Sequence, residues 1–164
     1  MLDINFYRKF DDVLDDIKKG KIQTREDCGK ALKSIMSDHP VVYNIETTNR
    51  CNMRCKMCPR TTMMTRKIED IDRETFLNVV DQIQPHSKED WALCKTYCEK
   101  KYGISEDDVA SENHFFLYII SKVIQLHGYG DPLLDKHMEE YVRILHEKGF
   151  ESYFSCNPAN IDFE

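Results

Sequence analysis

Three cysteines within eight residues constrain this chain more than any other feature of its 164 residues. They lie in the segment Cys51-Asn52-Met53-Arg54-Cys55-Lys56-Met57-Cys58, with Cx3Cx2C spacing. A closed structural zinc site normally has four protein ligands, whereas three thiolates on a [4Fe–4S] cluster leave one iron free to bind another molecule. The spacing therefore favours an iron–sulfur cluster with one exchangeable iron, held by Cys51, Cys55 and Cys58.

Other interpretations of these thiols stay open. They can be core residues, ligands of a zinc ion completed by a distant side chain such as His39 or Cys28, or ligands of an electron-transfer cluster with a remote fourth cysteine. The chain has seven cysteines, an odd number with uneven spacing, which argues against the disulfide framework of a small secreted protein. Clustered thiols in a reducing compartment indicate metal or redox chemistry instead.

Composition excludes two classes of partner. The net charge is −6 and no block of lysine and arginine stands out, so nucleic-acid binding is not expected. No apolar run approaches the roughly 20 residues that span a bilayer, and the first ten residues lack the apolar core of a secretory signal. We therefore expect a cytoplasmic chain without a membrane partner.

The predicted elements alternate between strand and helix after a helical start. Helices are predicted over 4–19 and 24–36, and the proline at position 40 ends this start. The elements that follow are a strand at 41–45, a helix at 72–84, a strand at 123–127, a helix at 135–148 and a strand at 152–156. Because strands that alternate with helices form parallel sheets, the pattern predicts an α/β domain.

Residues 86–118 interrupt this alternation as an insertion. Ser87 is suited to cap a helix that carries Cys94 and Cys98, and Ser105 is suited to begin another. Cys94 and Cys98 are four positions apart and share one helical face. They are candidates for a second metal or redox site, although simple packing as small apolar side chains is the commoner role.

The segment Ile45-Glu46-Thr47-Thr48-Asn49-Arg50-Cys51-Asn52-Met53-Arg54-Cys55-Lys56-Met57-Cys58-Pro59-Arg60 resembles the cluster-binding segment of the radical S-adenosylmethionine (radical SAM) superfamily. It is most similar to the branch that carries C-terminal auxiliary-cluster (SPASM-like) domains and modifies peptides or proteins. The loop directly follows a predicted strand, and loops at the C-terminal ends of strands build the active sites of such folds.

This resemblance, which runs from about residue 41 to 157, implies a fold. The family's catalytic domain is a partial (β/α)6 TIM-like barrel with parallel strands. Residues 41–164 would be its first part, preceded by the N-terminal helical segment 1–40 and interrupted by the insertion at about 86–118. The remaining strands would come from a missing C-terminal region or from a partner chain, because the third strand otherwise leaves an open sheet edge.

A second motif follows the strand predicted at 123–127. The segment His127-Gly128-Tyr129-Gly130-Asp131-Pro132-Leu133-Leu134 resembles the family's Gly-Gly-Glu-Pro turn, which binds the amino group of the methionine moiety. Tyr129 replaces the first glycine and Asp131 replaces the glutamate. Asp131 still offers a carboxylate, and Gly130 still allows a close backbone approach. By itself, the same sequence also suits an ordinary tight turn.

Two other positions resemble the family less closely. Ser155-Cys156-Asn157-Pro158 stands where the family often has a Thr-Asn-Gly-like turn, so Ser155 or Asn157 would reach the cofactor; a polar turn at a strand end is an equally good interpretation. Met57 stands where the family commonly has an aromatic residue that packs near adenine. Methionine can make the same apolar contact less rigidly.

The resemblance implies a radical enzyme. Its cofactors would perform the radical chemistry, so no side chain is assigned as catalytic. S-adenosylmethionine would chelate the fourth iron, and an electron donor such as flavodoxin or ferredoxin would reduce the cluster. Cleavage of the C5′–S bond would then give a 5′-deoxyadenosyl radical that abstracts hydrogen from a peptide or protein substrate. Two alternatives from other classes are a non-catalytic iron–sulfur or zinc binding module and an interaction domain that reuses the fold.

Overall fold

The protein is described from a computed structural model, which defines residues 1, 3–104 and 122–158. These residues form two compact units. The sheet unit consists of residues 1, 42–85 and 122–158, and the helical unit consists of residues 3–41 and 86–104. The helix predicted to begin at Ser105, and the end of the predicted insertion, lie outside the described residues.

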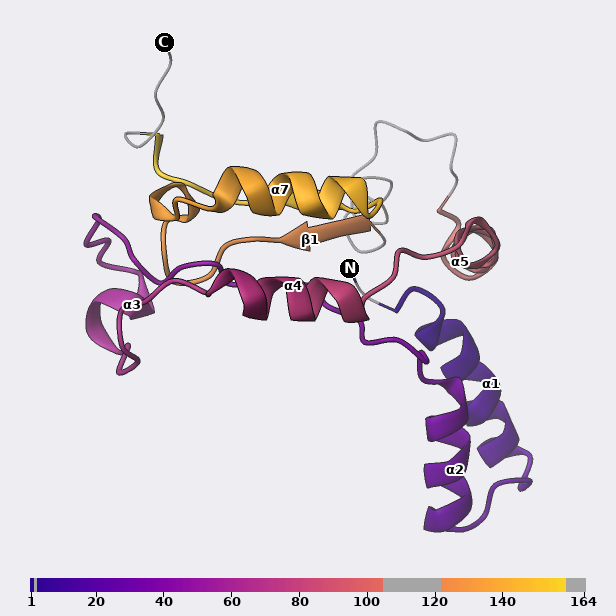
Figure 1. The fold of residues 1–164 in the computed structure, drawn as a ribbon. Coiled ribbons are helices and arrows are strands. Elements are labelled where there is room, and N and C mark those ends of the chain that lie inside the picture. The colour runs from indigo at the N-terminus through magenta and orange to yellow at the C-terminus, as the bar shows by residue number, and fades with distance from the viewer. Residues whose placement is uncertain (2, 105–121, 159–164) are drawn as a thin grey trace. The chain divides into compact units, whose positions relative to one another are not determined.

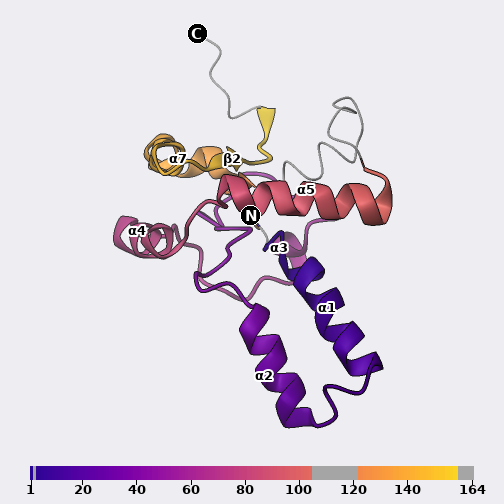
Figure 2. The same cartoon turned by 90° about the vertical axis from the view of Figure 1, so that its right-hand side faces the viewer.

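The helical unit contains three helices whose ends follow the predicted signals. They are α1 (Phe6–Lys18), α2 (Arg25–Ile35) and α5 (Lys88–Tyr102), and α1 and α2 run side by side as a hairpin (Figures 1 and 2). Thr24 and Ser87 cap α2 and α5 by accepting hydrogen bonds from the backbone N–H groups of Asp27 and Asp90. Gly103 ends α5 in the left-handed conformation, with φ of 68°. No described helix is both long and apolar enough to cross a membrane.

The sheet unit combines a short parallel sheet with helices, which confirms the predicted α/β class. Its elements are α3 (Pro59–Thr62), α4 (Arg73–Gln82), β1 (Val123–Gln125), the 3-10 helix η1 (Pro132–Leu134), α7 (Met138–Glu147) and β2 (Glu151–Tyr153). The strands β1 and β2 pair in parallel, with Val123 opposite Glu151. Both strands are shorter than predicted.

The strand predicted at 41–45 was wrong, because this segment makes only one parallel bridge, between Asn44 and Gln125. Two hydrogen bonds of 2.8 Å flank the bridge. On the N-terminal side of the bridge, the amino group of Met1 lies between the two segments. It donates to the carbonyl oxygens of Val42 at 2.8 Å and Val123 at 2.5 Å. On the other side, the carbonyl oxygen of Thr47 accepts the backbone N–H of Ile71 and not one from the strand region, so the ladder is not continued there.

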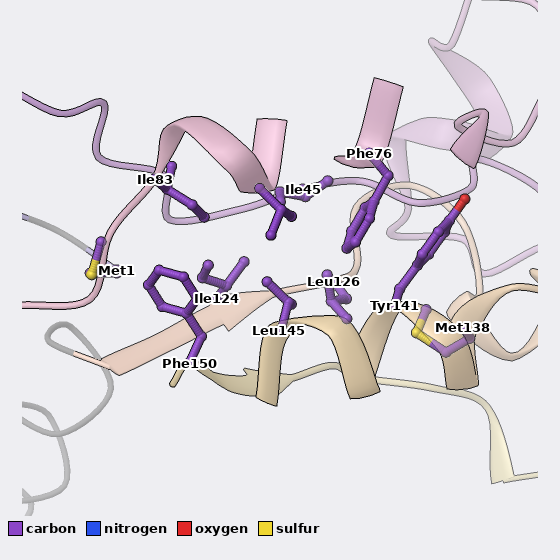
Figure 3. Packing of buried hydrophobic residues seen from close by; sticks show 11 residues of the cluster. Met1, Ile45, Phe76, Ile83, Ile124, Leu126, Met138, Tyr141, Leu145 and Phe150 are labelled. Atoms are coloured by element: carbon purple, nitrogen blue, oxygen red, sulfur yellow. The ribbon is translucent and has the colours of Figure 1, made fainter. Parts of the chain in front are cut away.

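The core of the sheet unit lies between the helices α4 and α7 and the strand β1, as Figure 3 shows. At its centre the rings of Phe76 on α4 and Tyr141 on α7 stack with centroids 3.9 Å apart. Both residues are fully buried, as are Ile124 and Leu126 from the strand region. Burial of a side chain of this size contributes about 2 kcal/mol, so this core fixes the two helices against the strand.

Candidate functional site

The cysteine loop, defined as residues 50–68, leaves the sheet unit and returns to it through a closed base. Thr48 and Asp70 form an isolated antiparallel bridge, and the backbone N–H of Ile71 donates to the carbonyl oxygen of Thr47 at 2.7 Å. Thr47 and Thr48 are buried. The backbone on both sides of the loop is therefore held in the core layer of the unit.

Side chains reinforce this base. Asn49 is buried, accepts the backbone N–H of Glu69 at 2.8 Å through Oδ1 and donates through Nδ2 to the carbonyl oxygen of Lys67 at 2.7 Å. The Nε atom of Arg50 lies 2.8 and 3.0 Å from the two carboxylate oxygens of Asp70. These anchors were not predictable from the sequence, because their partners are about 20 positions away and no local pattern joins them.

The three predicted ligands lie at the start and middle of this loop. Cys51 and Cys58 are half-buried, Cys55 is exposed, and all three are free thiols. The backbone N–H of Met53 donates to the sulfur of Cys51 at 3.4 Å. Met57 is 92% exposed, so its side chain is not held in place by packing within the unit. Its predicted contact with adenine stays a prediction.

The donor set of the loop suits an iron–sulfur cluster. Within the described ranges, no three His, Cys, Asp or Glu side chains gather so as to hold a single metal ion. A cubane cluster does not require such convergence, because each thiolate binds a different iron. Cys51, Cys55 and Cys58 are free thiols within eight residues of one loop, and the sulfur of Cys51 accepts a backbone hydrogen bond. Cysteine thiolates are the ligands that such clusters use.

The turn at 128–131 lies directly against the backbone that leads into Cys51. The backbone N–H of Asp131 donates to the carbonyl oxygen of Arg50 at 2.7 Å. A Cβ atom at Gly130 would overlap the carbonyl oxygen of Thr48 and would lie 2.7 Å from that of Arg50. Only glycine permits this approach of the turn to the backbone of the loop.

Asp131 also connects the turn to the end of β2. Its carboxylate is buried and accepts the backbone N–H of Leu133 at 3.1 Å and that of Asn157 at 3.0 Å. Ser155 is exposed, and its backbone N–H donates to Nδ1 of His127 at 3.2 Å. The structure therefore brings together the cysteine loop, the 128–131 turn and the 155–157 segment, which the sequence analysis assigned separately to the cofactor.

Tyr129 projects from the turn beside an ion pair. Its backbone N–H donates to Glu46 at 2.6 Å, and the guanidinium of Arg66 lies 2.6 Å from the other oxygen of Glu46 and 5.3 Å from the centre of the Tyr129 ring. Burial pushes the pKa of Glu46 upward, but the hydrogen bonds from Arg66 and Tyr129 outweigh it, so the pKa lies below its usual value. Glu46 is therefore ionised at neutral pH and holds the loop to the turn.

Cys94 and Cys98 lie elsewhere, in the interior of the helical unit. Both are buried and pack with Ile4 and Trp91. Burial, with the neighbouring Cys98 as a second cause, raises the pKa of Cys94 to about 12. The Cys94 thiol thus stays protonated at neutral pH, and the packing role is the better supported of the two that the sequence left open.

Asp135, between η1 and α7, is a buried carboxyl group that the sequence analysis did not single out. Its Oδ1 accepts the backbone N–H of His137 at 2.9 Å. Its buried Oδ2 has no hydrogen bond of normal geometry within the described residues. Burial is the largest cause of a raised pKa for Asp135, the charge of Asp70 adds to it, and the nearby Thr47 side chain lowers this pKa only slightly.

We expect Asp135→Asn to increase the free energy of unfolding by about 1 kcal/mol at neutral pH, because a neutral amide costs less to bury than an ionised carboxylate. A raised pKa means that the folded state holds this proton more tightly, so wild-type stability falls as the pH rises through and above 3.8. The advantage of the variant should therefore shrink as the pH is lowered toward 3.8. Urea unfolding at several pH values measures it; a difference that does not change with pH would contradict the assignment to ionisation.

No family model matches the chain, and neither a curated protein nor a solved structure matches it. The fold and the site therefore rest on the residues of this chain alone.

Proposed function

We propose that this chain carries the first part of a radical SAM enzyme, in which Cys51, Cys55 and Cys58 hold a [4Fe–4S] cluster that binds and reductively cleaves S-adenosylmethionine. One observation carries the proposal. Asp131 joins the cysteine loop to the turn through its backbone N–H and joins the turn to Asn157 through its carboxylate. The cysteine loop, the turn and the segment at Asn157, which the family resemblance assigns to one cofactor site, are thus all hydrogen-bonded through Asp131.

The order of the strands supports a partial (β/α)6 barrel. The segment at Asn44 pairs with β1, and β1 pairs with β2, so the order across the sheet follows the order along the chain. Both pairings are parallel. The helix α4 lies in the first connection and α7 in the second. Consecutive β/α units of a barrel follow one another in this order. We propose that later strands, from further sequence or from a partner chain, complete the barrel.

When bound, the cluster supplies the electron that breaks the C5′–S bond of S-adenosylmethionine, giving methionine and a 5′-deoxyadenosyl radical that takes hydrogen from the substrate. The protein's part is to position these groups. Asp131 fixes the turn through its two backbone hydrogen bonds, and its carboxylate is the group that the resemblance assigns to the amino group of the methionine moiety. Tyr129, Ser155 and Asn157 border the same region, and Met57 supplies a flexible apolar side chain from the loop.

The partners follow from the same proposal. A one-electron donor such as flavodoxin or ferredoxin would reduce the cluster, and the similarity to the branch with SPASM-like domains favours a peptide or protein substrate. All seven cysteines are free thiols, which suits a reducing compartment such as the cytoplasm.

Anaerobic reconstitution with iron and sulfide, followed by metal analysis, tests the cluster. We expect about four iron and four sulfide per chain, as a [4Fe–4S] cluster requires. Zinc without sulfide would instead identify a zinc module. Addition of dithionite and S-adenosylmethionine should yield 5′-deoxyadenosine, and a stable cluster that gives none would identify a non-catalytic module.

A further inference from the structure

A pocket of about 610 Å³ is formed by the cysteine loop itself, within the sheet unit, and Cys51 is part of its lining. Its lining combines basic side chains with apolar ones. The basic residues are Arg54, Arg60 and Arg66, and the apolar ones are Met53, Met64 and Ile68. The chain as a whole carries a net charge of −6, so three arginines around one hollow are a local reversal of its charge.

Two of these arginines have unused hydrogen-bond donors. Arg54 is exposed and has no hydrogen bond or ion pair within the described part of the chain. Arg60, on α3, donates through Nε to the carbonyl oxygen of Asn49 at 2.7 Å, which fixes the guanidinium and leaves its terminal nitrogens for a ligand. A guanidinium presents a planar fork of N–H groups that matches the two oxygens of a carboxylate.

Arg66 differs from the other two, because the carboxylate of Glu46 already pairs with it at 2.6 Å. The uncompensated charge of the pocket therefore lies with Arg54 and Arg60. Met53 and Ile68 are partly exposed beside them and offer apolar surface that adapts to a ligand. The pocket suits a carboxylate that is carried on an apolar stem.

We propose that this pocket binds a carboxylate of the substrate, on an acidic residue of a peptide flanked by apolar residues. The inference rests on the proposed function and adds a substrate class to it. The other source of a carboxylate is the methionine moiety of S-adenosylmethionine. In the proposed enzyme that carboxylate would coordinate the exchangeable iron, which would leave Arg54 and Arg60 to the substrate.

Isothermal titration calorimetry with two blocked tripeptides tests the proposal. The peptides are N-acetyl-Leu-Glu-Leu-amide and its glutamine counterpart, which differ in one charge. We expect the glutamate peptide to bind at least about tenfold more tightly, because a charge-assisted bond to arginine is about twice as strong as a neutral one. R54Q with R60Q should remove this preference, whereas R143Q, which removes an exposed positive charge on α7, should retain it.

The titration is performed on both the cluster-free and the reconstituted full chain, so that its outcome is separable from that of the proposed function. Equal binding of the two peptides, or no binding in either form, would overturn the carboxylate pocket even if 5′-deoxyadenosine is produced. Competition by S-adenosylmethionine for the same site in the cluster-free chain would assign the arginines to the cofactor and would also overturn it. Glutamate-selective binding without any cluster would support the pocket while the proposed function fails.

Discussion

Replacement of Cys55 by alanine is expected to reduce cluster-bound iron to background and to abolish formation of 5′-deoxyadenosine. Cys55 is the exposed member of the three thiols, so its removal takes nothing from the core. Two thiolates then remain in the loop, and a cluster that has lost one of three protein ligands is not retained. The loss is therefore one of ligation and not of folding.

Anaerobic reconstitution followed by visible absorption and analysis of iron and sulfide measures this effect, and circular dichroism verifies that the fold persists. Cys28→Ala is the matched control, because Cys28 is a half-buried free thiol on α2, outside the sheet unit. It should reconstitute as the wild type does. Full iron content and normal product in Cys55→Ala would refute the three-cysteine site.

Replacement of Gly130 by alanine is expected to lower the free energy of unfolding by about 3 kcal/mol, at the upper end of the cost of overpacking. The new Cβ would overlap the carbonyl oxygen of Thr48 and lie 2.7 Å from that of Arg50, and both are backbone atoms. Neither can rotate away as a side chain does. The turn must therefore move away from the cysteine loop, which breaks the hydrogen bond from Asp131 to Arg50.

Urea unfolding measures this cost, and iron analysis after reconstitution measures its effect on the site. Gly29→Ala is the control, because apart from its chain neighbours and the backbone of its own helix no described atom lies within 4 Å of a Cβ at that position. It should raise stability by about 0.5–1 kcal/mol, the difference in helix propensity between glycine and alanine. If Gly130→Ala unfolds within about 0.5 kcal/mol of the wild type, the range of neutral surface substitutions, the close approach would not exist in solution.

Helix ends were predictable because the contacts that set them are local. Thr24, Asp72 and Ser87 each accept the backbone N–H three positions further on, and Gly103 ends α5 with a positive φ. A side chain of the right type at the right position is sufficient for such a cap. These elements could therefore be derived without any knowledge of the rest of the molecule.

The predicted strand at 41–45 illustrates the opposite case. Its β-branched composition is that of a strand, yet only the bridge at Asn44 forms. The amino group of Met1 takes the adjacent carbonyl oxygens, and Thr47 pairs instead with Ile71. Strand pairing depends on partners far along the chain, so composition indicates a strand without deciding how far it extends.

For the candidate site, the sequence by itself determined which chemical groups are present: the spacing of Cys51, Cys55 and Cys58, the glycine at 130 and the carboxylate at 131 are all fixed by residue type and order. Only the tertiary structure decided that Asp131 ties the turn to both Arg50 and Asn157. The closure of the loop by Asp70 belongs to the tertiary structure as well. The physical reason is that hydrogen bonds between distant segments depend on how the core places their backbones, and no local pattern of residues encodes that placement.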